Sequence, residues 1–135
     1  MRDKRFLVVE DEKSVADFVR TVIELEGGIA VLAATAALAL TCLRRDGPFD
    51  LMVLDLALPD RSGWELLVSA HDLLADCKVV IFSAQLPDDG AERARDAGVA
   101  LALVKPVAAS TLRDALASAL RMPPAPQAGT PPLRR

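Results

Sequence analysis

The sequence is poor in the residues on which several classes of protein depend. It contains no tyrosine and only one histidine, and its two cysteines, Cys42 and Cys77, are far apart. A zinc site needs cysteine or histidine ligands at close spacing, and a disulfide-stabilised fold needs more cysteines, so we expect neither. This cysteine usage is typical of a reducing compartment, and we predict a cytoplasmic location.

Basic charge and long apolar runs are also scarce. The formal net charge is −3, so the chain offers no basic stripe for nucleic-acid phosphates, and we expect no nucleic-acid partner. The apolar residues near the start, Phe6–Val9, are too few for a signal peptide. The longest apolar run, Ala33–Leu40, is interrupted by Thr35 and is too short to cross a bilayer. We therefore expect a soluble protein without a membrane partner.

The chain is rich in apolar residues arranged in short segments. Its hydrophobic content of 52% in 135 residues is enough for one compact core. Aliphatic segments of strand length alternate with segments of helical period, which is typical of a parallel sheet covered by helices. The strand candidates are Arg5–Val9, Ile29–Ala33, Leu51–Leu54, Val79–Phe82 and Ala100–Val104. The helix candidates are Val15–Leu25, Thr35–Arg45, Gly63–Ala75, Asp88–Ala97 and Ala108–Arg121, the last capped by Ser110 or Thr111. We predict an α/β fold with βα repeated five times, forming a doubly wound five-stranded parallel sheet with helices on both faces.

The composition changes after residue 121. Prolines stand at positions 123, 124, 126, 131 and 132, which disfavours a helix or a strand there. We predict one domain over residues 1–121 and a proline-rich, disordered tail over residues 122–135.

Polar side chains follow four of the five predicted strands. Glu10 and Asp11 follow the first, Asp55 the third, Ser83 the fourth and Lys105 the fifth. The carboxyl ends of parallel strands meet at one edge of the sheet, where ligands bind. Three carboxylates packed together repel one another unless their pKa values rise or a cation binds. Because Mg²⁺ prefers carboxylate and phosphate oxygens, we predict a Mg²⁺ site at which a carboxylate attacks phosphorus.

The segments around these residues resemble the receiver domain of two-component response regulators over residues 4–121. The matching segments are 7–12 (Leu-Val-Val-Glu-Asp-Glu), 53–60 with Gly63, 81–84 (Ile-Phe-Ser-Ala) and 104–106 (Val-Lys-Pro). The resemblance implies a flavodoxin-like fold. It also implies that Asp55 accepts a phosphoryl group from a histidine kinase or a histidine phosphotransfer protein. The protein would then be a single-domain signalling switch or phosphorelay shuttle, acting on a downstream protein target and not as an enzyme.

The same resemblance implies a role for each site residue. Ser83 and Lys105 would contact the phosphoryl oxygens on Asp55. The metal ligands would be Glu10, Asp11, Asp55 and the backbone carbonyl of Ala57, with Glu10 acting partly through water. The family also suggests a cis peptide bond between Lys105 and Pro106, and homodimerisation through the fourth helix, fifth strand and fifth helix.

The sequence departs from the family where receivers transmit their signal. Many receivers carry tyrosine or phenylalanine three positions before the lysine, and this chain has Ala102 there. Transmission must therefore use Ser83 and the fourth helix without that ring, or another surface. Ala57 and Gln85 occupy the two positions that tune the lifetime of the phosphorylated state in the family, and Gln85 can hydrogen-bond a hydrolytic water.

Three other functions compete with the receiver as an explanation of this sequence. A phosphatase-like enzyme using Asp55 would need a second acid at position 57, where this chain has alanine, and a substrate-covering cap domain. A nucleotide- or flavin-binding module would need a glycine-rich loop after the first strand, but residues 10–14 are acidic. A degenerate receiver acting as a binding adaptor remains an alternative for the output step, because Ala102 stands where many receivers have an aromatic ring.

Overall fold

The computed structural model describes residues 1–123, which form one parallel five-stranded sheet with the strand order β2-β1-β3-β4-β5. The strands are β1 (Arg5–Val9), β2 (Ile29–Ala33), β3 (Leu51–Leu54), β4 (Lys78–Ser83) and β5 (Leu101–Val104). The helical elements are α1 (Lys13–Leu25), α2 (Ala36–Asp46), α3 (Gly63–Ser69), the 3₁₀ helix η1 (His71–Leu73), α4 (Gly90–Asp96) and α5 (Ala109–Arg121). The predicted doubly wound sheet is confirmed.

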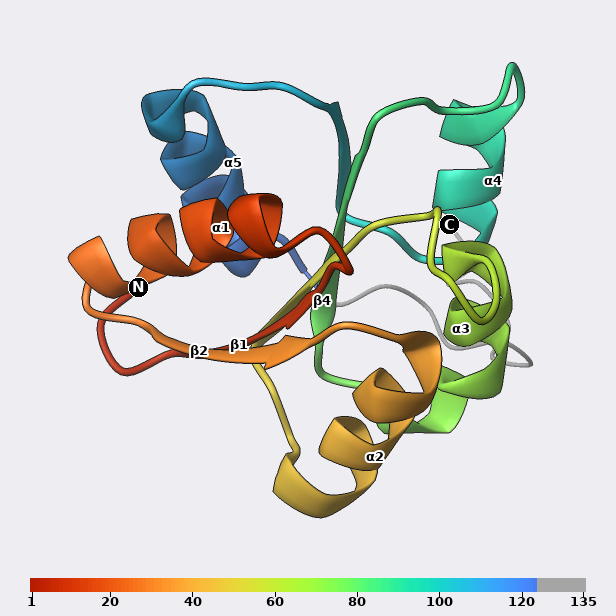
Figure 1. The fold of residues 1–135 in the computed structure, drawn as a ribbon, viewed down its shortest axis with the longest axis horizontal. Helices are drawn as coiled ribbons and strands as arrows, with labels where there is room; N and C mark the ends of the chain where they lie inside the picture. The colour runs from red at the N-terminus through yellow and green to blue at the C-terminus, as the bar shows by residue number, and fades with distance from the viewer. Residues whose placement is uncertain (124–135) are drawn as a thin grey trace, which may run out of the picture.

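Helices cover both faces of the sheet. α1 and α5 lie together on one face, and α2, α3 and α4 lie on the other (Figure 1). Alternate residues of β1 point to opposite faces: Leu7 and Val9 pack with residues of α2 and α3, whereas Phe6 and Val8 pack with residues of α1 and α5. Because both faces are covered, the central strands are continuous apolar runs, as the sequence indicated.

The third helix is shorter than predicted. The expected segment ran to Ala75, but α3 ends at Ser69 and the chain tightens into η1. Leu73 and Leu74 still pack against the core formed with α2 and α3. Their apolar spacing therefore resembled a continued helix, although a 3₁₀ helix of this kind is common where an α-helix ends.

The predicted beginnings of the last two helices also need correction. α4 begins at Gly90 and not at Asp88, because the chain first turns after Pro87 and the Gly90 amide donates to the Pro87 carbonyl at 2.8 Å. The N-cap of α5 is Ala108, which makes no side-chain hydrogen bond. The prediction that Ser110 or Thr111 caps this helix is therefore wrong, since both residues lie inside its first turn.

The end of α1 agrees with the sequence analysis. Gly27 has a φ of 85°, a left-handed conformation that favours glycine. A Cβ on Gly28 would lie 2.7 Å from Cγ2 of Ile23 and 2.9 Å from Cε1 of Phe6. The two glycines thus allow the chain to turn closely against the core and enter β2.

The C-terminal end of the domain and the tail are only partly described. α5 ends at Arg121, and the predicted disordered tail falls outside the described residues from position 124 onward. Within residues 1–123, no helix combines the length and the hydropathy that a membrane crossing requires.

Candidate functional site

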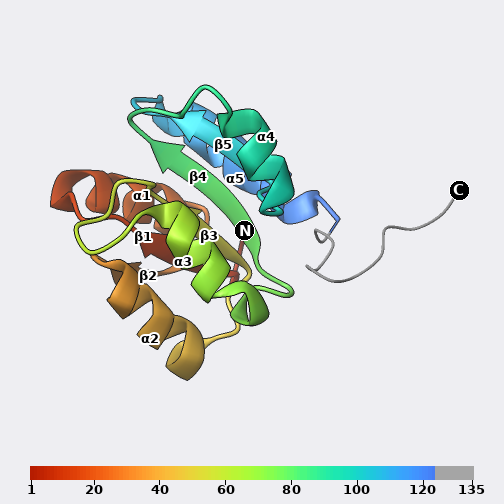
Figure 2. The ribbon, with the colours of Figure 1, turned by 90° about the vertical axis from the view of Figure 1, so that its right-hand side faces the viewer.

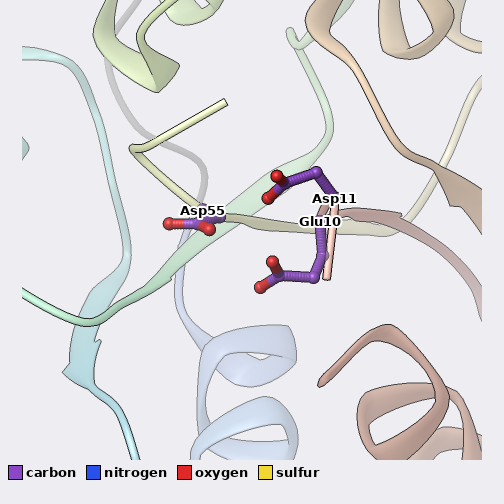
Figure 3. Close-up of side chains that lie close together, drawn as sticks. All are labelled: Glu10, Asp11 and Asp55. Atoms are coloured by element: carbon purple, nitrogen blue, oxygen red, sulfur yellow. The ribbon is translucent and has the colours of Figure 1, made fainter. Parts of the chain in front are cut away.

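Three acidic side chains meet at the carboxyl edge of the sheet. The parallel register pairs Val9 with Leu54, so the residues that follow β1 and β3 lie next to each other. Figure 3 shows Glu10 and Asp11 after β1 beside Asp55 after β3. One oxygen from each of these three carboxylates lies within 4.8 Å of the others. The structure therefore brings the predicted acidic cluster together.

Asp55 is held by three hydrogen-bond donors and is only 6% exposed. Its Oδ1 accepts from the Ser83 hydroxyl at 2.8 Å and from the Ala57 amide at 3.1 Å. Its Oδ2 accepts from Lys105 Nζ at 3.3 Å. Donors on both oxygens fix the orientation of the carboxylate, and they come from β4, from the loop after β3 and from the end of β5.

Lys105 joins Asp55 to Glu10. Its ammonium donates to Glu10 Oε1 at 2.6 Å, while Glu10 Oε2 accepts from the Glu12 amide at 3.1 Å. Burial, helped by the nearby Asp55, raises the pKa of Glu10 even though these hydrogen bonds act in the opposite direction. Burial also acts to lower the pKa of Lys105, but its contacts with the two carboxylates outweigh this and raise it. Lys105 is therefore a cation at neutral pH.

The donor set fits a hard divalent cation. One ammonium cannot neutralise three carboxylates, and Asp11 is exposed, which leaves this side of the cluster accessible from solvent. Carboxylate oxygens without histidine or cysteine are the ligands that Mg²⁺ prefers, with water completing its octahedral shell. Glu10, Asp11 and Asp55 could thus hold Mg²⁺.

The loop between Asp55 and α3 folds back tightly on itself. Ala57 and Ser62 form an isolated antiparallel bridge, and the Gly63 amide donates to the Leu56 carbonyl at 2.8 Å. A Cβ on Gly63 would lie 2.8 Å from the carbonyl oxygen of Asp55 and 2.9 Å from the Cα of Leu56. Gly63 was part of the sequence motif, but only the structure gives the reason: α3 begins directly against the backbone of Asp55.

Sequence reasoning missed the role of one further acid in this loop. The two carboxylate oxygens of Asp60 accept from the backbone amides of Ala36 and Ala37, both at 2.9 Å. These bonds lower the pKa of Asp60. The partners lie more than 20 positions earlier and are backbone groups, so no residue pattern could have indicated them.

The region around Ala102 is filled without an aromatic residue at that position. Ala102 packs, together with Trp64 and Leu86, against the buried residues Leu56, Ile81 and Ala94. The Arg93 guanidinium of α4 lies 4.6 Å from the centre of the Trp64 ring. Trp64 is therefore a packing residue at the start of α3, and it contacts α4.

One smaller expectation at the site has a clear outcome. The peptide bond between Lys105 and Pro106 is cis, as the resemblance implied, and the bond between Gly47 and Pro48, for which nothing was predicted, is cis as well. Gln85 is exposed just after β4.

Comparison with known proteins identifies the family. The family model described as the response regulator receiver domain matches residues 6–117. The chain is 37% identical over 118 residues to the alginate biosynthesis transcriptional regulatory protein AlgB of Pseudomonas putida, covering 87% of this chain and 26% of that protein. It is 33% identical over 139 residues to the virulence sensor protein BvgS of Bordetella pertussis, covering 94% of this chain and 11% of that protein. The chain thus spans about a quarter and about a tenth of the lengths of these two relatives.

A solved structure agrees in both fold and extent. The CheY-like response regulator receiver domain protein from Methanospirillum hungatei JF-1 has a TM-score of 0.82 and 30% identity to this chain. The match covers 87% of this chain and 94% of that one. The motifs, the parallel sheet and these matches together lead to one conclusion: the chain belongs to the response regulator receiver domain family.

Proposed function

We propose that Asp55 is the phosphoryl acceptor of this receiver domain and that Ser83 and Lys105 assist the transfer. One observation carries the proposal: the buried Asp55 carboxylate accepts from Ser83 and Lys105 at 2.8 and 3.3 Å, within the cluster that it forms with Glu10 and Asp11. A structural acid at the end of a strand does not need a partly buried lysine and a second, partly exposed acidic pair beside it. This combination of nucleophile, cation and hydroxyl suits phosphoryl transfer.

The transfer is a displacement at phosphorus. An oxygen of Asp55 forms the new P–O bond while the P–N bond of a phosphohistidine breaks. The electron pair of the broken P–N bond stays on the imidazole nitrogen, and the imidazole takes up a proton. Lys105 and Ser83 already touch the carboxylate, so each has only a short distance to move to reach a phosphoryl oxygen. Glu10, Asp11, Asp55 and the Ala57 carbonyl would hold Mg²⁺, which would supply positive charge to the phosphoryl oxygens.

The partners follow from this chemistry. Receiver domains are signalling domains, and we propose a histidine kinase or histidine phosphotransfer protein as donor and a protein as downstream target. The proposal further includes a cytoplasmic, single-domain regulator with a tail after residue 121, and homodimerisation through α4, β5 and α5. Mixing the protein with a phosphorylated donor and following phosphate transfer would test the donor class.

Replacing Asp55 by asparagine is expected to abolish phosphorylation by acetyl phosphate with Mg²⁺, because the amide cannot act as the nucleophile. Intact mass should show one added phosphoryl group on the original protein and none on Asp55→Asn. Asp72→Asn is the matched control, since Asp72 is fully exposed and outside the acidic cluster. A phosphoryl group on Asp55→Asn, or none on either the original protein or the control, would contradict the proposal.

Mg²⁺ affinity is expected to fall as the pH is lowered, and the fall should begin at a pH above 4.5, the ordinary pKa of glutamate. Burial raises the pKa of Glu10, and a protonated Glu10 no longer offers an anionic oxygen. Below that pKa, proton competition weakens binding by about tenfold per pH unit. Calorimetric Mg²⁺ titrations across the acid range should show this loss, and Glu10→Gln should bind more weakly and lack the part of the loss that protonation of Glu10 causes. Identical pH profiles would exclude Glu10 as the titrating group.

A further inference from the structure

The first turn of α2 is held by two side chains of different origin. Thr35, directly before the helix, accepts the Leu38 amide on its hydroxyl at 3.0 Å. Asp60 accepts the two preceding amides, those of Ala36 and Ala37, one on each carboxylate oxygen at 2.9 Å. The three amides at the beginning of α2, which have no partner within the helix, are thus all bonded. Thr35 is a local cap, whereas Asp60 reaches α2 from the loop after β3.

The contact between Asp60 and α2 fixes the tip of the loop that carries Ala57. The near end is closed by the bridge between Ala57 and Ser62 and by the hydrogen bond from the Gly63 amide to the Leu56 carbonyl. Ser62 in turn accepts the Glu65 amide and caps α3. Asp60 lies between Ala57 and Ser62, so the loop contacts α2 at its tip, beyond this closed base. Figure 2 shows this loop, in yellow-green between β3 and α3, curving past the end of the sheet to which the strand arrows point.

The loop matters for the site because Ala57 lies within it. The Ala57 amide donates to the Asp55 carboxylate at 3.1 Å. A shift of this backbone therefore also moves one of the hydrogen-bond donors that orient Asp55. α2 itself is anchored, since Ala36 and Ala39 at its beginning are fully buried against the sheet. A carboxylate that binds the backbone of an anchored helix with both oxygens restrains its own loop in position and in rotation.

We propose that Asp60 is a positioning residue for metal binding: by bonding the first turn of α2, it holds the Ala57 backbone in the orientation that binds Mg²⁺. The inference rests on the proposed function, since it takes Ala57 as a metal ligand. Asp60 does not touch the metal or the phosphoryl group in this proposal. It acts through the loop, in the way that groups behind metal ligands set ligand orientation.

Three variants separate positioning from simple helix capping. Asp60→Ala removes both bonds to α2, and Asp60→Asn retains one acceptor oxygen without the charge. Thr35→Ala removes a cap of the same helix without touching the loop. Mg²⁺ affinity of each folded protein is measured by calorimetry with MgCl₂ alone, and thermal unfolding is measured in parallel without Mg²⁺.

The positioning role predicts an unequal result. Asp60→Ala should weaken Mg²⁺ binding by about tenfold, the lower end of the effect of groups that orient metal ligands. Asp60→Asn should lie between Asp60→Ala and the original protein, because one bond remains. Thr35→Ala should lower the melting temperature but leave Mg²⁺ affinity unchanged.

Three results would overturn the inference. Unchanged affinity in Asp60→Ala shows that the loop does not need this contact. Equal losses in Thr35→Ala and Asp60→Ala assign the effect to the stability of α2, and equal losses in Asp60→Asn and Asp60→Ala assign it to charge alone. The proposed function fails differently, since the original protein would then bind Mg²⁺ without gaining a phosphoryl group on Asp55.

Discussion

Replacing Lys105 by methionine is expected to strengthen Mg²⁺ binding while slowing phosphorylation of Asp55 by about 10²-fold. The ammonium lies 2.6 Å from Glu10 and 3.3 Å from Asp55, so it competes with a metal ion for the same carboxylates. Its removal leaves the acidic cluster more negative and therefore a better cation site. The same removal takes away a donor that stabilises charge on the phosphoryl oxygens, which slows transfer.

The two effects are measured separately, by calorimetric Mg²⁺ titration and by the rate of mass gain with acetyl phosphate. Lys78→Met is the matched control, because Lys78 begins β4 whereas Ser83 ends it at the carboxyl edge. This control should leave both quantities nearly unchanged. Weaker Mg²⁺ binding in Lys105→Met, or unchanged phosphorylation, would show that Lys105 does not have the proposed role.

Replacing Gly63 by alanine is expected to lower the free energy of unfolding by about 1–3 kcal/mol, the usual effect of overpacking a closely packed position. The new Cβ would lie 2.8 Å from the Asp55 carbonyl oxygen and 2.9 Å from the Leu56 Cα. Both are backbone atoms that cannot rotate away, so the loop or α3 must shift. Because the displaced backbone carries Asp55, phosphorylation should also slow in the fraction that remains folded.

Gly90→Ala is the control for this substitution. Gly90 is also the first residue of a helix, but its Cβ would meet side-chain atoms of Leu86 and Pro87 at 3.1 and 3.4 Å. Alanine also favours the helix by up to about 1 kcal/mol over glycine. Urea unfolding should therefore show a clear loss for Gly63→Ala and little change for Gly90→Ala. Equal stabilities of the two variants would mean that the close approach at Gly63 relaxes without cost.

The fold could be predicted from the sequence because its strands are buried on both faces. Such strands are short aliphatic runs, and the segments between them have helical period, so the order of the elements could be read directly. Boundaries were less certain where apolar spacing continued past a helix end, as at Leu73 and Leu74 after α3. The capping prediction for α5 failed because the residue directly before this helix is Ala108, whose methyl group cannot accept a hydrogen bond.

The residues that meet at the candidate site could be predicted from the sequence, but the contacts between them could not. Asp55 and Lys105 each follow a strand and Ser83 ends one, and parallel topology brings strand ends together. Sequence order could not reveal that Lys105 bonds Glu10 more closely than Asp55, because this depends on how the chain turns after β5. The contact of Asp60 with α2 also depends on loop geometry, since its partners are backbone amides that any sequence offers.

The contact between Trp64 and Arg93 makes intrinsic tryptophan fluorescence a probe of the position of α4. The chain has one tryptophan and no tyrosine, so emission excited above the phenylalanine band comes from a single place. That indole carries a guanidinium of α4 on its face at 4.6 Å and packs beside Leu56, the residue that follows Asp55. A shift of α4 relative to α3 therefore changes the surroundings of the only fluorophore. Binding of a partner to α4 can be followed in unlabelled protein, provided that the partner itself lacks tryptophan.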